Sequence, residues 1–124
     1  MKHLFEYAVI RVVPRIERGE QVNVGVVIYC QDLDYLCARV HIDPAKLRAL
    51  DPTIDLAELR TALHAWESTC DGSSGQPPAG LKLGERFRWL TGPRSTIIQA
   101  GPVHTGLTED PAAELDRLIQ QLVL

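Results

Sequence analysis

The fold is decided by residues 5–42, which read FEYAVIRVVPRIERGEQVNVGVVIYCQDLDYLCARVHI. This stretch contains three runs rich in aromatic and β-branched residues, at 5–13, 22–30 and 35–42, and such runs are typical of strands. Turn-forming residues separate the runs, with Pro14 and Gly19 in the first connection and two aspartates in the second. Because both connections are short, we expect the three strands to form an antiparallel meander.

The run at 22–30 is predicted to be the central strand, because both of its faces are largely apolar. Regular alternation predicts that one face of this strand carries Val22, Val24, Val26 and Ile28. The opposite face would then carry Asn23, Gly25, Val27 and Tyr29.

Helices are predicted after the meander. Asp43 and Pro44 have the pattern of an N-cap followed by a proline at the first helical position, which indicates a short helix to about residue 50. Asp55 begins a longer helix that ends near residue 70. The five acids and single arginine of residues 51–80 are interpreted as the solvated face of that helix.

The remaining segments predict one more strand and one more helix. Residues 81–90 are ambiguous, and a turn or two of helix is expected there. Residues 93–100 should form a fourth strand and 101–108 a loop, after which Thr108 should cap a last helix. We therefore predict one α+β domain over residues 1–124, with an antiparallel sheet of about four strands, helices packed on one face and a flexible loop at 71–80.

Composition limits the class of protein. A chain of 124 residues is long enough for one domain with a real core, and its 45% hydrophobic content is ordinary for a globular protein. The net charge of −3 argues against a protein whose main role is to bind nucleic acid. An odd count of three cysteines, no apolar leader and no apolar run of about 20 residues together predict a cytoplasmic protein that is not in the membrane.

The first candidate site contains Arg11 and Asn23, which are polar residues in otherwise apolar strands. A buried guanidinium or amide is costly unless it is hydrogen-bonded. One interpretation is structural: Arg11 pairs with an acid such as Glu20, and Asn23 satisfies backbone groups at a bulge near Gly25. The other interpretation is a pocket for an anion or a nucleotide.

The second candidate is the basic and aromatic block at residues 85–96, which includes Arg88, Arg94 and Ser95. Guanidinium, aromatic and hydroxyl groups together can stack a base and hold a phosphate, but Trp and Arg are also enriched at protein interfaces. A third interpretation is that Phe87 and Trp89 belong to the core while the arginines are solvated. On the charge argument, a protein partner is preferred to nucleic acid.

His104, in the Pro- and Gly-framed segment 102–106, is the third candidate, since a loop histidine can act as a general base. No serine or cysteine nucleophile can be paired with it by spacing, so we predict no catalytic residue. Cys30, Cys37 and His41 lack the close ligand pairs of a structural zinc site. We therefore expect neither a metal site nor a cofactor.

Five blocks of the chain carry a family resemblance. YAVIRVVPR at 7–15 and ERGEQVNVGVV at 17–27 resemble the N-terminal motif of the bacterial family catalogued as domain of unknown function 3037. RFRWL at 86–90, GPRST at 92–96 and PVHTG at 102–106 are similar to its other blocks. The resemblance supplies no activity and no residue roles; it implies an accessory role beside a HipA-like kinase.

Two functions are therefore carried forward. The first is a non-enzymatic accessory or interaction protein, with a HipA-like kinase as its partner. The second is a binder of, or an enzyme acting on, a small anionic or phosphorylated ligand. The blocks chosen on chemistry coincide with the family's blocks, so we predict one binding site in which six side chains converge: Arg11, Asn23, Arg88, Arg94, Ser95 and His104.

Overall fold

The computed structural model describes residues 1–71, 81–93 and 96–124. The elements in chain order are β1 (His3–Val12), the 3-10 helix η1 (Ile16–Arg18), β2 (Val22–Cys30), β3 (Tyr35–Val40), α1 (Pro44–Leu50), α2 (Leu56–Asp71), α3 (Leu83–Thr91), β4 (Ile98–Ala100), β5 (His104–Thr108) and α4 (Pro111–Leu122). The predicted loop at 71–80 begins at the last residue of α2, and its residues 72–80 lie outside the described residues.

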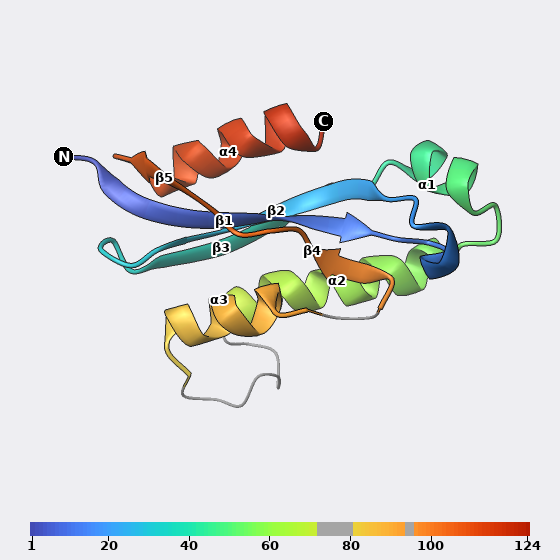
Figure 1. The fold of residues 1–124 in the computed structure, drawn as a ribbon, viewed down its shortest axis with the longest axis horizontal. Coiled ribbons are helices and arrows are strands. Elements are labelled where there is room, and N and C mark those ends of the chain that lie inside the picture. The colour runs from blue at the N-terminus through green and yellow to red at the C-terminus, as the bar shows by residue number, and fades with distance from the viewer. Residues whose placement is uncertain (72–80, 94–95) are drawn as a thin grey trace.

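The strands form one five-stranded antiparallel sheet, in the order β3-β2-β1-β4, with β5 also paired to β1 (Figure 1). The predicted α+β class and the N-terminal meander are confirmed. The fourth strand is shorter than predicted, and β5 lies where a loop was expected. β5 gives little sequence signal because its one large apolar residue, Leu107, points to solvent and is 60% exposed.

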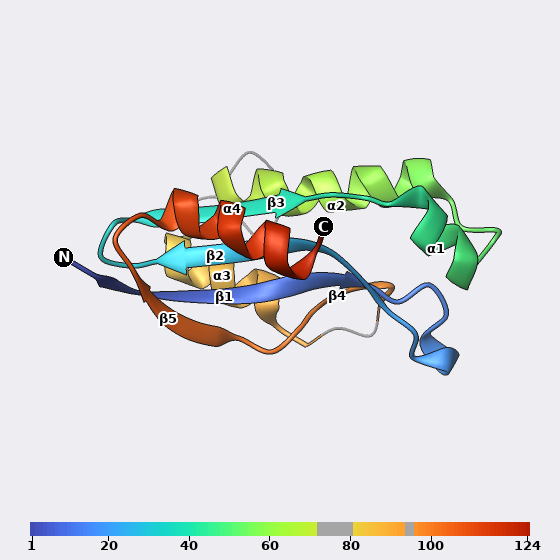
Figure 2. The same ribbon diagram turned by 90° about the horizontal axis from the view of Figure 1, so that it is seen from above.

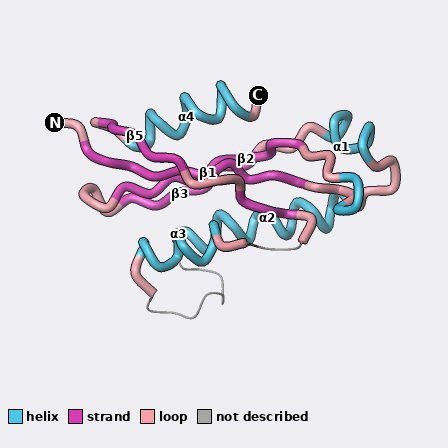
Figure 3. Tube along the Cα trace, in the orientation of Figure 1, coloured by secondary structure: helices cyan, strands magenta, loops and turns pink. Residues whose placement is uncertain are grey.

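Helices cover both faces of the sheet (Figures 1 and 3). α2 and α3 share one face and enclose a core that includes Ile10, Val12 and Val27, so the predicted packing of helices on one face is confirmed for these two helices. α4 lies on the opposite face and closes a second core with Phe5 and Ile28. Cover on both sides follows from β2, because a strand that is apolar on both faces must be buried on both.

A β-bulge changes which face each residue of β2 occupies. Ile10 of β1 pairs with Gly25, while the next residue, Arg11, pairs with Asn23, so Val24 is left between the two pairs. Regular alternation is therefore wrong across this point. Val22 and Val24 join the core under α2, whereas Val26 and Ile28 join the core under α4. The extra residue of the bulge shifts the side-chain period by one.

Asp43 and Asp110 cap helices by accepting backbone N–H groups. Asp43 accepts from Ala45 and Lys46 at the start of α1, as its position before Pro44 predicts. The start of α4 differs from the prediction, because Asp110 caps this helix. Thr108 instead accepts a hydrogen bond from the backbone N–H of Asp110 at 3.1 Å, which holds the residue that caps α4.

Across the described part of the chain, no helix has both the length and the apolar character needed to cross a membrane.

Candidate functional site

Arg11 and Asn23 lie side by side on the face of the sheet that carries α4. They are cross-strand partners at the bulge, and Asn23 Nδ2 donates to the carbonyl oxygen of Leu122 at 3.0 Å. This bond attaches β2 to the last turn of α4. Asn23 therefore satisfies a backbone group, as in the structural interpretation, but that group belongs to α4 and not to the bulge.

Arg11 does not form the ion pair that the structural interpretation expects. Glu20, its expected partner, instead forms an ion pair with Arg18. Within the described residues, no carboxylate pairs with Arg11, and its Nε is buried without a hydrogen-bond partner.

Arg88 lies on the other face of the sheet. Its Nη1 and Nη2 each donate to a carboxylate oxygen of Glu6 at 2.9 Å, and its guanidinium lies 5.2 Å from the ring centroid of Phe87. The hydrogen bond to Glu6 raises the pKa of the Arg88 guanidinium. The interpretation of Phe87 as a core residue is confirmed, since its side chain is fully buried.

His104 is exposed on β5, opposite Tyr7 of β1, and the two ring centroids are 5.3 Å apart. Tyr7 packs against the core under α4, so His104 shares the sheet face of Arg11 and Asn23. It is nevertheless separated from them along β1, because Tyr7 comes four residues before Arg11. A four-residue step along a strand is about 13 Å.

One converging site is therefore not formed by the described candidates. Arg11 and Asn23 are adjacent, His104 is farther along the same face, and Arg88 lies on the opposite face with Glu6. The reason is strand parity: Glu6 and Arg11 are five residues apart on β1 and so point to opposite faces. Arg94 and Ser95 lie outside the described residues.

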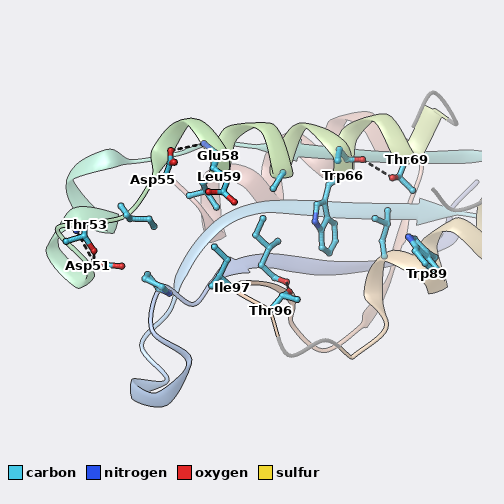
Figure 4. Close-up of a pocket in the computed structure, with 16 residues that line it drawn as sticks. Asp51, Thr53, Asp55, Glu58, Leu59, Trp66, Thr69, Trp89, Thr96 and Ile97 are labelled. Atoms are coloured by element: carbon cyan, nitrogen blue, oxygen red, sulfur yellow. Dashed lines mark hydrogen bonds between the residues drawn. The ribbon is translucent and has the colours of Figure 1, made fainter. Parts of the chain in front are cut away.

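A groove that sequence reasoning missed lies on the α2 face of the sheet (Figure 4). It encloses about 740 Å³ and runs along α2, with Thr96, Ile97 and Ile98 facing the helix and Trp89 of α3 at one end. The small side chains of Ala62 and Ala65 line it from α2, and they leave space that larger residues would fill.

The floor of the groove is apolar and one of its ends is acidic. Four buried side chains lie along the floor: Leu59, Trp66, Leu90 and Ile98. Ile97 and Trp89 also line the groove while remaining 42% and 47% exposed. Leu59 and Trp66 have the spacing of an apolar helix stripe, but the sequence does not show which side chains across from them leave a gap.

Three carboxylates, those of Asp51, Asp55 and Glu58, lie at the end of the groove away from Trp89 (Figure 4). Asp51 forms a 3.6 Å ion pair with Arg15, and a hydrogen bond from Thr53 lowers the pKa of its carboxyl. Asp55 accepts the backbone N–H of Glu58 at 3.0 Å. Glu58 is exposed and has no ion pair with any residue described, so its charge faces the solvent at the groove.

The three cysteines are free thiols. Burial raises the pKa of Cys70 to about 12, which keeps that thiol protonated at neutral pH. A search of the residues in 1–71, 81–93 and 96–124 finds no group of three or more histidine, cysteine or acidic side chains placed to hold a metal ion.

The fold and the groove define a class: an antiparallel α+β domain with helices on both faces of its sheet and an apolar groove beside α2. The chain belongs to the family described as protein of unknown function (DUF3037), whose profile matches residues 7–123. The resemblance of the five sequence blocks is thereby confirmed over nearly the whole chain. Comparisons with curated proteins and with solved structures gave no match.

Proposed function

We propose that this protein is a non-enzymatic accessory protein that binds a segment of a partner protein in the groove between α2 and residues 96–98. The observation that carries the proposal is the exposure of large apolar side chains inside a concave surface. Ile97 and Trp89 line the groove and keep about half of their surface in water. Covering such surface is favourable by about 25 cal/mol per Å², and tryptophan is frequent among the residues that dominate binding energy.

The groove also favours one charge on its occupant. At its acidic end Asp51 pairs with Arg15, whereas Asp55 and Glu58 are exposed and form no ion pair with any described residue. A partner segment with apolar side chains and a lysine or arginine beyond them would match this pattern. The apolar side chains would contact Trp89 and Ile97, and the cation would lie near Glu58.

A HipA-like kinase is the first partner to test, because the family resemblance implies such an association. The proposal places both proteins in the cytoplasm. Free cysteines fit that compartment, where thiols are kept reduced.

Affinity purification from the native host tests the proposal with two matched variants. Ile97→Ser removes an exposed apolar side chain from the groove, and Leu107→Ser removes one of similar exposure from β5, away from the groove. We expect the wild-type protein and Leu107→Ser to retain the same partner, identified by mass spectrometry as a HipA-like kinase, and Ile97→Ser to lose it.

Circular dichroism of each variant checks that the fold is retained. Recovery of the same proteins with Ile97→Ser as with the wild type would contradict the use of the groove. If no protein co-purifies with the wild-type chain above the background from untagged cells, the accessory role is contradicted.

A further inference from the structure

Arg11 occupies an unusual position for a guanidinium. It lies in β1 between two other strands, pairing with Asn23 of β2 on one side and with Gln99 of β4 on the other. α4 packs on β2 and β3, so the part of β1 beside β4 is not covered by this helix (Figure 2). Arg11 therefore reaches the surface from the middle of the sheet, on the face opposite the groove.

The surroundings of Arg11 fix its position closely. A Cβ atom at Gly101 would lie 2.9 Å from both Cζ and Nη2 of Arg11 and 3.2 Å from its Nε. The guanidinium therefore lies against Gly101, in space from which a side chain at position 101 would displace it. Gly101 is itself held by a 2.8 Å hydrogen bond from its N–H to the carbonyl oxygen of Val9.

No protein group described neutralises this charge. Nε is enclosed and lacks a hydrogen-bond partner, and Nη1 and Nη2, which also make no bond, keep contact with solvent. Five other arginines pair with a carboxylate, namely Arg15, Arg18, Arg39, Arg88 and Arg117, and the half-buried Arg86 donates to the Cys70 carbonyl. No aspartate or glutamate occurs in the sequence of residues 72–80 and 94–95, which the structure does not describe, so these segments supply no carboxylate side chain.

The cross-strand neighbours of Arg11 add donors and no negative charge. Asn23 and Gln99 each use one amide N–H, toward the carbonyl oxygens of Leu122 and Thr96. An amide nitrogen carries two hydrogens, so each retains a second donor. A guanidinium that is half buried without a counter-charge is costly, and its planar fork matches the oxygens of a carboxylate or a phosphate.

We propose that Arg11, flanked by the amides of Asn23 and Gln99 and seated on Gly101, binds an oxyanion, either the phosphate of a small ligand or a carboxylate of a peptide. The site is separate from the groove and does not depend on the proposed partner. The ligand approaches Nη1 and Nη2 from the uncovered part of the sheet, because Nε is enclosed.

Nuclear magnetic resonance of the full chain tests the site with inorganic phosphate and with acetate, each titrated at constant ionic strength. We expect the Arg11 Nε–H resonance and the side-chain amides of Asn23 and Gln99 to shift with one common, saturating curve. Arg60, exposed on α2, is the matched control and should show no saturating shift. Saturation by phosphate alone points to a phosphorylated ligand, and saturation by acetate alone points to a peptide carboxylate.

The variant Arg11→Lys keeps the positive charge but loses the planar pair of donors that a guanidinium offers to an oxyanion. It should weaken saturating binding about tenfold, the loss expected for one hydrogen bond to a charged group. The proposal is overturned if neither anion gives a saturating shift in the wild type, or if Arg11→Lys binds as tightly as the wild type. The wild-type titration needs no variant, so it decides the matter even if Arg11→Lys does not fold.

Discussion

Two arginines of this chain, Arg11 and Arg88, show how differently one residue type is used on the two faces of the sheet. Arg88 is exposed and makes two hydrogen bonds to Glu6. Arg11 is half buried and makes none. The sequence predicts that both residues are polar points of interest, but it does not separate them, because a partner 82 residues away cannot be seen in the spacing.

Replacing Arg11 by methionine should leave the protein as stable as the wild type or more stable. Methionine keeps the apolar stem of the side chain and removes a guanidinium that has no described partner, and a buried polar group without a hydrogen bond costs about 1–3 kcal/mol. Urea unfolding followed by circular dichroism measures the difference. Arg88→Met is the comparison, and it should be less stable because Glu6 loses both of its hydrogen bonds.

If Arg11→Met lowers the free energy of unfolding by more than about 2 kcal/mol, the guanidinium is satisfied within the fold. That result would contradict the view that Arg11 has no partner in the protein.

Burial of the Cys70 thiol makes the free energy of unfolding fall at alkaline pH. The unfolded chain releases this proton near the ordinary thiol pKa of 9.0, whereas burial raises the pKa in the folded protein to about 12. Between these values the folded state binds more protons than the unfolded state, so the free energy of unfolding falls as the pH rises. One such group changes the slope by at most about 1.4 kcal/mol per pH unit.

The measurement is the free energy of unfolding between pH 8 and pH 11 in the wild type and in Cys70→Ala. The wild type should lose stability more steeply above pH 9 than the variant does. Parallel curves would show that the thiol of Cys70 titrates at the same pH in both states.

At the scale of elements, the attachment of α4 is set by caps and by the bulge. Asp110 accepts two backbone N–H groups at the start of the helix, and Asn23 holds the carbonyl of Leu122 at its end. The backbone N–H of Asp110 donates to Thr108 of β5, so α4 is hydrogen-bonded to the sheet at both of its ends.

Asp110→Ala should lower the free energy of unfolding by about 1 kcal/mol, the usual cost of losing an N-cap. Asp110→Asn should retain most of the stability, because an amide oxygen also accepts these bonds. Glu109→Ala is the matched control, since Glu109 is exposed and caps no helix, and its effect should stay within about 0.5 kcal/mol. Equal losses in Asp110→Ala and Glu109→Ala would show that net charge near the helix start, and not the cap, is responsible.

The sequence predicts most elements because their signals are local. The bounds of β2 are confirmed as 22–30, and the start of α1 follows from Asp43 and Pro44. β5 is missed because HTGLT has no apolar alternation, and it is a strand only because β1 offers an edge to pair with. A bulge near Gly25 is only one interpretation of the sequence, because a bulge exists in the register between two strands.

At the scale of the whole molecule, the two faces of the sheet differ in chemistry. The α2 face has an apolar groove with an acidic end, and the α4 face has an uncovered part with an unpaired cation. The acidic stretch at 51–80 was interpreted only as a solvated helix face. Three of its carboxylates border the groove, which could not be predicted because the opposite wall comes from residues 96–98, far along the chain.

Of the described side chains predicted to converge, the structure brings together only the two that are closest in the sequence. Arg11 and Asn23 are neighbours, as their places in consecutive strands allow, while Arg88 is directed to the other face. Family blocks that coincide with chemically interesting residues thus do not define a single site. They are distributed between the groove face, with Trp89, and the face that carries Arg11.

The central claim is that the groove binds a partner protein, and the most direct measurement is calorimetric titration of the purified HipA-like kinase from the same host into three forms of the chain. We expect saturable binding to the wild type and to Leu107→Ser, with affinities within a factor of about two, and at least about tenfold weaker binding to Ile97→Ser, as for a residue central to an interface. No heat of binding with the wild type, or equal affinity for Ile97→Ser, would contradict it.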